Sequence, residues 1–302
     1  MTDRLLGTVG AALAEAVERL RASGSPSPRL DAEVLLAHIS DRDRSWLLAH
    51  GEAALDDVVD RAFRAAVRRR MTGEPVAYIR GFKDWHSLRI RTDARALVPR
   101  PETEGLAEAA VADIEARLAR QGCGSRPVVV WEVATGSGAV AVALGLRFRA
   151  ALDAGKLMLL ASDVSSDALE LAMENLAEHG VSGFVTLLHA DLLTASGGWS
   201  LPRPDVVVAN LPYLSTAEVD AAAGSLAHEP RVALEAGSDG LRLLRRLFAE
   251  LPAKAPRGAT VLLEVALGQA DAVAALAPAT ATADAMHDLS GVPRVVVVRL
   301  AA

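Results

Sequence analysis

The feature that most constrains the fold of this chain is a regular alternation of apolar strands and helical segments beyond residue 121. Strands are predicted at 128–133, 157–162, 185–189, 205–209, 260–265 and 294–299, and helices at about 138–151, 166–179, 239–251 and, in an alanine-rich tract, 270–286. Such alternation is typical of a mostly parallel sheet covered by helices on both faces. We therefore expect an α/β domain that presents its chemistry where the strands end.

The part of the chain before this α/β region has a different pattern. Residues 1–75 are predicted to form a small helical domain, because apolar residues recur at helical spacing, for example from Leu5 to Leu20. Residues 76–98 are predicted to form a β-hairpin linker, with strands at 78–82 and 88–91. Residues 99–302 form the remaining domain, which begins with a helix at about 102–120.

Composition excludes several classes of protein. Apolar residues make up 51% and charged residues 23%, and no apolar stretch approaches the roughly 20 residues that a membrane span needs. The amino-terminal residues lack the features of a secretory signal, so we expect a cytoplasmic protein without a membrane partner. A single cysteine, Cys123, excludes a cysteine-based metal cluster, and we expect no metal.

Charge also restricts the partners of the larger domain. The formal net charge of the chain is −6, and residues 99–302 carry the acidic excess. Affinity for nucleic acid comes largely from neutralising phosphates with basic side chains. We therefore expect no stable complex with nucleic acid.

The fourth strand of this region runs directly into the turn Asn210-Leu211-Pro212-Tyr213. The amide of Asn210 can donate and accept hydrogen bonds, Pro212 stiffens the turn, and Tyr213 adds a flat ring with a polar tip. These groups can hold a planar, NH2-bearing group by its edge and its face. The same sequence is also compatible with an ordinary turn.

Three earlier strand ends carry residues suited to a nucleoside. The first is followed by the glycine loop Ala134-Thr135-Gly136-Ser137-Gly138, which allows close approach of a ligand at a helix amino-terminus. The second ends at Asp163, which can accept both ribose hydroxyls, and the third at Asp191-Leu192, which can border an adenine.

Two kinds of nucleoside cofactor are compatible with these strand ends. With Ala141, the glycine loop also fits the relaxed dinucleotide-binding pattern Gly-x-Gly-x-x-Gly/Ala. Dehydrogenases do not require the Asn210 turn, however, so a phosphate-free nucleoside such as S-adenosylmethionine suits the chain better.

Over nearly its whole length the chain resembles the HemK-like family of protein-(glutamine-N5) methyltransferases, which modify peptide-chain release factors. The motifs that carry this resemblance are Pro-Arg-Leu-Asp-Ala-Glu at 28–33, Glu-Pro-Val-Ala-Tyr-Ile at 74–79, Val-Pro-Arg-Pro-Glu-Thr-Glu at 98–104, the glycine loop, the Asn-Leu-Pro-Tyr turn, Glu-Pro-Arg-Val-Ala-Leu at 229–234, Asp-Gly-Leu at 239–241 and Leu-Leu-Glu-Val at 262–265. The resemblance implies a Rossmann-like class I methyltransferase fold with a mostly parallel seven-stranded sheet. It also implies S-adenosylmethionine as cofactor and the glutamine of a release factor's Gly-Gly-Gln loop as target.

The resemblance implies a role for each site residue. Glu132 and the loop Ala134, Thr135, Gly136, Ser137 and Gly138 would hold the methionine part of the cofactor, Asp163 its ribose, and Asp191 and Leu192 its adenine. The side-chain oxygen of Asn210 and the carbonyl of Leu211 would accept the two amide hydrogens of the target glutamine, with Pro212 and Tyr213 packed around that amide.

Three residues depart from the family pattern. Leu211 replaces a proline, Glu132 replaces an aspartate, and Ala134 replaces a glycine, which is acceptable only if its φ angle is negative. The alternatives that stay open are an RNA adenine-N6 methyltransferase, a divergent paralogue that methylates another protein or a small molecule, and a binding module without catalysis.

Overall fold

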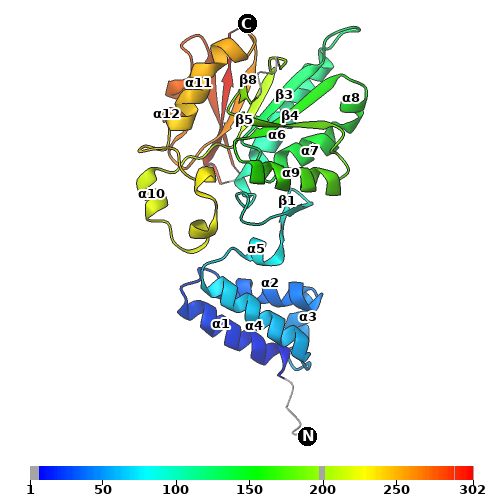
Figure 1. Ribbon diagram of the computed structural model, residues 1–302, viewed down its shortest axis with the longest axis vertical. Coiled ribbons are helices and arrows are strands. Elements are labelled where there is room, and N and C mark those ends of the chain that lie inside the picture. Colours follow the sequence, from blue (N-terminus) through cyan, green and yellow to red (C-terminus); the bar gives the residue numbers. More distant parts are fainter. Residues whose placement is uncertain (1–6, 197–200, 289, 302) are drawn as a thin grey trace. The chain divides into compact units, whose positions relative to one another are not determined.

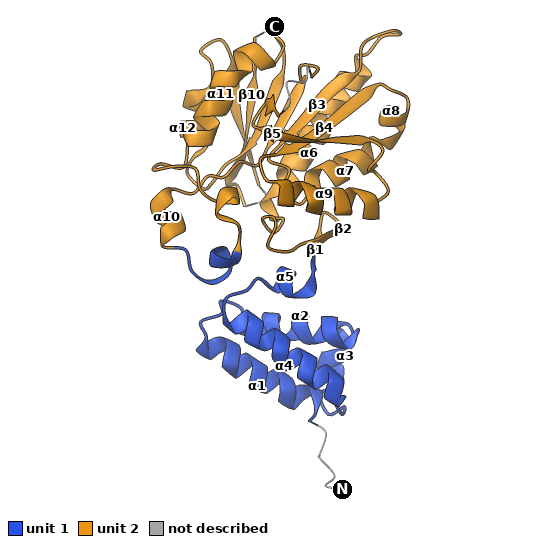
Figure 2. Ribbon diagram, viewed as in Figure 1, with its two compact units in different colours: residues 1–82, 222–228 blue, residues 83–221, 229–302 orange. Residues whose placement is uncertain are grey.

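The computed structural model describes residues 7–196, 201–288 and 290–301. The chain divides into two compact units, one made of Met1–Phe82 with Ala222–His228 and the other of Lys83–Ala221 with Glu229–Ala302 (Figure 2). Each unit has a hydrophobic core of its own, as is expected of a domain.

The first unit is helical, as predicted. Its helices are α1 (Val9–Ala22), α2 (Pro28–Ser40), α3 (Arg44–Ala49), α4 (Asp57–Met71) and α5 (Val76–Arg80) (Figure 1). Thr8 caps α1 by accepting a hydrogen bond from the Ala11 N–H, and Pro28 begins α2, where a missing N–H costs nothing. The helices bury leucine and phenylalanine side chains such as Leu20 and Phe63. Leu5, which begins the predicted pattern, lies outside the described residues.

A segment far away in the sequence completes this unit. The short 3₁₀ helix η1 (Gly224–His228) belongs to it, and Arg70 connects the segment to α2. The Nε of Arg70 donates to the buried carboxylate of Asp31 (2.7 Å), and the Nη1 of Arg70 donates to the Ser225 hydroxyl (3.1 Å). The Nε2 atom of His228 lies 2.8 Å from the Thr72 carbonyl.

The strand predicted at 78–82 is wrong, because residues 76–80 form α5 instead. Pro75 precedes this helix, and Gly81 ends it in a left-handed conformation (φ 79°), which is a common end for a helix. The predicted hairpin is present, but its first strand begins only after this helix; its strands are β1 (Phe82–Trp85) and β2 (Leu88–Arg91).

The second unit is built on one sheet, with the strand order β6-β5-β4-β3-β7-β8-β10-β9. The bounds are β3 (Val128–Val133), β4 (Leu157–Asp163), β5 (Val185–Asp191), β6 (Thr194–Ala195), β7 (Val206–Ala209), β8 (Thr260–Glu264), β9 (Thr282–His287) and β10 (Pro293–Arg299). The five central strands are parallel, and β6, β9 and β10 are antiparallel to their neighbours. The predicted mostly parallel sheet is confirmed, but it has eight strands instead of seven, because the two-residue β6 is added at one edge.

Helices cover both faces of this sheet, as the strand sequences require. The helices are α6 (Glu102–Ala119), α7 (Ala139–Arg147), α8 (Arg149–Asp153), α9 (Ser166–Glu178), α10 (Thr216–Asp220), α11 (Arg242–Lys254) and α12 (Ala270–Leu276), with the 3₁₀ helix η2 (Arg231–Ala233). On β3, Val128 and Val130 pack with α6 and α7, while Val129 and Trp131 pack with α11. In the part of the chain that the structure describes, no helix is both long and apolar enough to cross a bilayer.

The helix predicted over 270–286 is correct only in its first half. It ends at Leu276, shortly before Pro278, and residues 282–287 form β9. This strand pairs antiparallel with β10, from Thr282 opposite Arg299 to His287 opposite Pro293. Pairing with a neighbouring strand therefore overrides the local helical preference of the alanines.

Candidate active site

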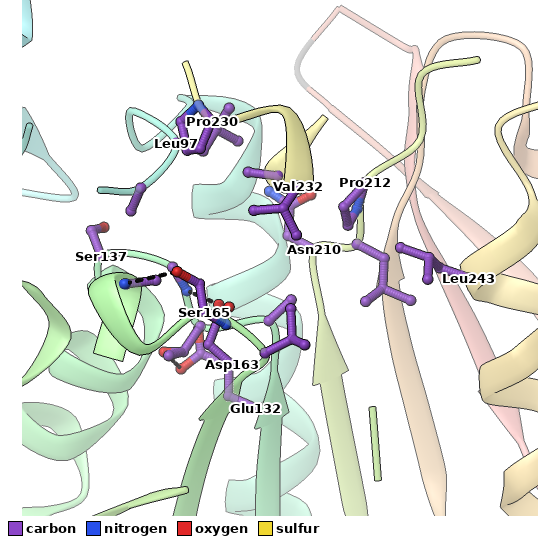
Figure 3. Close-up of a pocket in the computed structure, with 18 of the residues that line it drawn as sticks. Leu97, Glu132, Ser137, Asp163, Ser165, Asn210, Pro212, Pro230, Val232 and Leu243 are labelled. Carbon is purple, nitrogen blue, oxygen red and sulfur yellow. Dashed lines mark hydrogen bonds between the residues drawn. The ribbon is translucent and has the colours of Figure 1, made fainter. Parts of the chain in front are cut away.

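A cavity of about 470 Å³ lies at the carboxyl-terminal edge of the sheet (Figure 3). Four strands supply residues to it: Ala134 follows β3, Asp163 ends β4, Asp191 ends β5 and Asn210 follows β7. Open α/β sheets bind ligands at this edge, and the volume is in the range of small-molecule sites.

The cavity brings together most of the predicted site residues. It is lined by Glu132, Ala134, Thr135, Gly136, Ser137, Asp163, Asp191, Leu192, Asn210, Leu211 and Pro212. Gly138 and Tyr213 are not among its lining residues. Gly138 begins α7 with φ 77°, and a Cβ atom there would lie 3.0 Å from the Cβ of Ala172, so this glycine permits close packing of the loop on α9.

The glycine loop is attached to β4 through Asp163. The carboxylate of this residue accepts hydrogen bonds from the N–H groups of Gly136 (2.9 Å) and Ser165 (2.9 Å) (Figure 3). Burial raises the pKa of Asp163, and the N–H groups of Ser165 and Gly136 oppose this rise because they stabilise the charged form. The acidic group predicted to hold a ribose therefore also fixes the loop in place.

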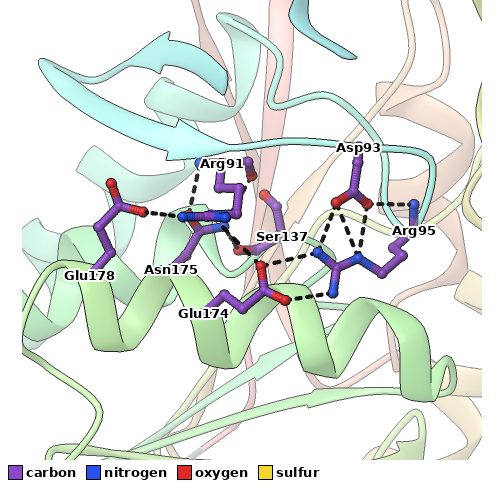
Figure 4. Close-up of polar contacts among 7 residues, drawn as sticks. All are labelled: Arg91, Asp93, Arg95, Ser137, Glu174, Asn175 and Glu178. Atoms are coloured by element: carbon purple, nitrogen blue, oxygen red, sulfur yellow. Dashed lines mark hydrogen bonds and ion pairs between the residues drawn. The ribbon is translucent and has the colours of Figure 1, made fainter. Parts of the chain in front are cut away.

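A second attachment of the loop comes from Asn175, a wholly buried residue of α9 (Figure 4). Its Nδ2 donates to the carbonyl of Ser137 (2.8 Å) and to that of Arg91 (3.1 Å), and its Oδ1 accepts from the Arg91 N–H (2.8 Å). Around it, Arg91 and Arg95 form exposed and half-exposed ion pairs with Glu174. One amide thus joins the glycine loop to the end of β2.

Ala134 adopts a left-handed conformation with φ 58°. The negative φ that we expected for an alanine at this position is therefore wrong. The chain turns sharply here between β3 and the glycine loop, and the left-handed region is costly for a residue with a Cβ atom.

Glu132 is a buried carboxyl group next to the glycine loop. Burial, and to a smaller extent the charge of Asp163, raise its pKa to about 8, although the Thr135 hydroxyl donates to its Oε2 (2.8 Å). A carboxyl group in this setting favours a positively charged partner, because a nearby cation stabilises the ionised form. It is suited to the ammonium end of an amino acid.

The other end of the cavity carries the predicted adenine contacts. Asp191 is exposed, and its Oδ2 accepts a hydrogen bond from Arg246 of α11 (2.8 Å). Leu192 is buried and has φ 54°, which turns the chain after β5. A carboxylate and an apolar side chain therefore lie next to each other, as the sequence predicts.

The turn after β7 is fixed by contacts on two sides. The Nδ2 of Asn210 donates to the hydroxyl of Thr103 in α6 (3.1 Å), and the carbonyl of Tyr213 accepts from Gln269 (3.1 Å). Gly240 lies against the same carbonyl: a Cβ atom there would be 2.3 Å from the Tyr213 oxygen. Only glycine fits this approach, which explains the Asp-Gly-Leu motif.

The remaining wall of the cavity comes from two segments whose roles the sequence did not reveal. Glu229 is buried, and its carboxylate accepts from the Val98 N–H (3.1 Å) and from Arg100 (2.6 Å). Trp85 donates to the Arg100 carbonyl (2.8 Å). The Pro-Arg-Pro-Glu-Thr-Glu and Glu-Pro-Arg motifs were the available signal, but only the fold shows that Glu229 joins them.

Comparison with known proteins gives consistent results. Residues 11–81 match the family model described as the PrmC N-terminal domain. The release factor glutamine methyltransferase of Rhodopirellula baltica is 38% identical over 247 residues, which cover 81% of this chain and 79% of that protein. That of Deinococcus radiodurans is 37% identical over 292 residues, covering 96% and 97%. The hMettl16 catalytic domain, solved in complex with a MAT2A 3′UTR hairpin, is 14% identical with a TM-score of 0.51 over 81% of each chain, so it is similar in fold alone.

Proposed function

Because the chain belongs to the release factor glutamine methyltransferase family, we propose that it methylates the side-chain amide nitrogen (N5) of a glutamine in a peptide-chain release factor. The observation that carries this proposal is the orientation of the Asn210 amide. Its nitrogen donates to Thr103 (3.1 Å), so its oxygen is the atom left to accept a hydrogen bond from a substrate in the cavity. Such an acceptor suits the NH2 group of a glutamine.

The residues of the cavity fit S-adenosylmethionine as the cofactor. Glu132, whose buried carboxyl favours a positive partner, would bind the ammonium group, and the loop 134–138 would surround the methionine part. Asp163 would accept from the ribose, and Asp191 and Leu192 would border the adenine. When bound, this cofactor supplies a methyl group on a positively charged sulfur.

The substrate amide would be held by two acceptors in the turn after β7. Asn210 Oδ1 and the Leu211 carbonyl would each accept one hydrogen of the glutamine NH2 group, which exposes the nitrogen lone pair to the methyl donor. Leu211 occupies the position of a proline in the family pattern, but the acceptor is its backbone carbonyl, which every residue provides. The contribution of the protein is then mainly orientation.

The site does not need a strong general base. Burial, followed by the charge of Glu264, raises the pKa of Tyr213, so its phenol keeps its proton at neutral pH and cannot accept another one. The amide nitrogen can lose its proton after methylation, once it has become positively charged. Until the nitrogen is methylated, Asn210 and Leu211 would accept hydrogen bonds from its two N–H groups.

The direct test is transfer of a labelled methyl group from S-adenosylmethionine to a release factor. We expect label on the glutamine of the Gly-Gly-Gln loop and none on a release factor in which this glutamine is replaced by alanine. A ribosomal RNA fragment tests the adenine alternative in parallel. Label on the RNA, or no label on the release factor, would contradict the proposal.

Asn210 is the residue on which the proposal depends most. We predict that Asn210→Ala lowers the rate of transfer by about tenfold or more, since it removes an orienting contact of about 1–3 kcal/mol. Binding of S-adenosylmethionine, measured by calorimetry, should stay within about threefold of the parent. Equal rates in the variant and the parent would contradict the role of Asn210 in orienting the substrate.

A further inference from the structure

A buried carboxyl group lies beside Asn210 on the neighbouring strand. Ala209 of β7 pairs with Leu263 of β8 in parallel register, so Asn210 and Glu264 leave adjacent strands at the same level. Glu264 is 4% exposed, and its Oε2 has no hydrogen-bond partner among the described residues. A buried carboxylate is costly unless it is paired or hydrogen-bonded, so an unsatisfied carboxyl oxygen at this place calls for an explanation.

Thr103 lies between these two residues. Its hydroxyl accepts from Asn210 Nδ2 (3.1 Å), and it lies close enough to the carboxyl group of Glu264 to lower the pKa of that group by favouring its ionised form. A threonine hydroxyl has one hydrogen to donate and two lone pairs to accept with. If its hydrogen points to Glu264, it can only accept from Asn210.

We infer that Thr103 and Glu264 are positioning residues that set which way the Asn210 amide faces. Ionised Glu264 takes the hydroxyl hydrogen of Thr103, Thr103 then accepts from Asn210 Nδ2, and Asn210 Oδ1 is left for the amide of the substrate. The inference rests on the proposed function, because it assigns Asn210 Oδ1 to that amide.

The protonation state of Glu264 decides the direction of this chain of hydrogen bonds. A neutral Glu264 can donate its own proton to Thr103, which frees the hydroxyl hydrogen for Asn210 Oδ1 and favours the reversed amide. Burial raises the pKa of Glu264 to about 7, so the two forms exchange near neutral pH. The productive orientation therefore gains population as the pH rises.

Charged groups on the surrounding segments act on Glu264 in opposite directions. Glu102 of α6 raises its pKa, whereas Arg294 of β10 and Arg100 before α6 lower it. Tyr213 also lies close enough for the charge of Glu264 to raise its pKa. Arg294 pairs with Glu102 (3.8 Å), so these two charges partly cancel.

Three variants test the inference through the rate of methyl transfer at saturating cofactor, measured from about pH 6 to about pH 8.5. The rate of the parent should rise with pH and level off above the pKa of Glu264. Glu264→Gln should remove this pH dependence, since an amide does not ionise in this range. Thr103→Val should lower the rate about tenfold, and Thr103→Ser, which keeps the hydroxyl, should recover it to within about threefold.

Thr260 provides the matched control. It is a buried threonine on β8, the strand of Glu264. Its hydroxyl also joins β8 to α6, through Asp113 (3.1 Å) and Arg117 (2.9 Å). It pairs with Val206, four residues before Asn210. Thr260→Val should keep both the rate and its pH dependence. A pH profile that is unchanged in Glu264→Gln, or equal rates in Thr103→Val and Thr260→Val, would overturn the inference.

A second measurement separates this inference from the proposed function. The side-chain ¹⁵N–¹H signals of Asn210, assigned by their absence in Asn210→Ala, report the partner of its NH2 group without any substrate. We expect them to shift with pH in the parent and not in Glu264→Gln. Such a titration in a protein that does not methylate release factor would refute the function alone, and methylation without the titration would refute the role of Glu264.

Discussion

Ala134 carries a structural cost at the entrance of the glycine loop. A left-handed conformation costs about 1–2 kcal/mol for a residue with a Cβ atom, whereas glycine adopts it freely but loses about 0.4–1 kcal/mol through its more flexible unfolded state. We predict that Ala134→Gly raises the free energy of unfolding by about 0.5–1 kcal/mol. Chemical denaturation of the parent and the variant measures this difference in the free energy of unfolding.

The control for this substitution is an alanine in an ordinary helical position. Ala112 is exposed near the middle of α6, and Ala112→Gly should lower stability by about 1 kcal/mol. If both glycine variants were destabilised equally, the φ of 58° at Ala134 would carry no cost.

If Glu132 binds the ammonium group of the cofactor as proposed, we expect cofactor binding to depend on pH. With a pKa of about 8, its carboxyl is mostly protonated near neutral pH, and a cationic ammonium group favours the ionised form. Binding should therefore release a proton, and affinity should increase between about pH 6 and about pH 8. Calorimetry in two buffers of different ionisation enthalpy detects the proton. Glu132→Gln should bind more weakly and without pH dependence; a pH-dependent variant would contradict this assignment.

At the scale of elements, Asn175 is the connection whose loss should matter most. Asn175→Leu keeps the size of the side chain but removes the three hydrogen bonds of a buried amide, to Ser137 and Arg91. We predict a loss of about 2–4 kcal/mol of stability together with weaker cofactor binding, because the glycine loop loses its support from α9.

Glu178 supplies the comparison on the same helix. It is half exposed and pairs with Arg91 at 3.5 Å, so Glu178→Ala should cost about 0–1 kcal/mol. Denaturation curves of both variants, with calorimetry for the cofactor, measure the difference. A similar small effect of Asn175→Leu would show that the loop holds its shape unaided.

The sequence predicts elements well where burial alone decides them. The strand Val128–Val133 is buried along its whole length, and its apolar run gives its bounds without any neighbour. Residues 282–287 are mostly exposed and alternate weakly, so their strand depends on pairing with β10, which the local sequence does not contain. Tyr78 and Ile79 are compatible with a strand or a helix. The flanking Pro75 and Gly81 favour the helix α5, because they lie at its two ends.

The same reasoning explains which site residues the sequence revealed. Asp163 ends a strand and Asn210 directly follows one, so their position at the sheet edge could be predicted. Thr103 lies in the first turn of a helix, and Glu264 ends a strand inside an apolar run. The hydrogen bond from Asn210 to Thr103 and the place of Glu264 on the neighbouring strand both depend on the fold. Roles that need two distant segments to meet are not visible in either segment.

At the scale of the whole molecule, two buried carboxyl groups make stability depend on pH. Folding raises the pKa of Glu132 to about 8 and that of Glu264 to about 7, from an ordinary value of 4.5. Between these values the folded state binds more protons than the unfolded state, so stability falls as the pH rises. We predict a decrease of about 1.4 kcal/mol per pH unit for each group between pH 4.5 and pH 7 in the protein without cofactor.

Carboxyl groups paired with arginine do not change stability between pH 4.5 and pH 7. Hydrogen bonding to Arg95 lowers the pKa of Asp93 and of Glu174, so their contributions are lost only at more acidic pH. Urea denaturation at several pH values measures the slope. The slope should be less steep in Glu132→Gln than in the parent, because one proton-binding group has been removed, and a stability that increases from pH 5 to pH 7 would contradict the prediction.

The presence of Gly224–His228 in the helical unit has a consequence for biosynthesis. A chain leaves the ribosome from its amino-terminus, and domains generally fold as they emerge. The helices α1 to α5 are complete once residue 80 has been made, but the unit that they form receives its last segment only after β3, β4, β5 and β7 have been synthesised. The unit that is synthesised first is therefore not complete until much of the second unit has been made.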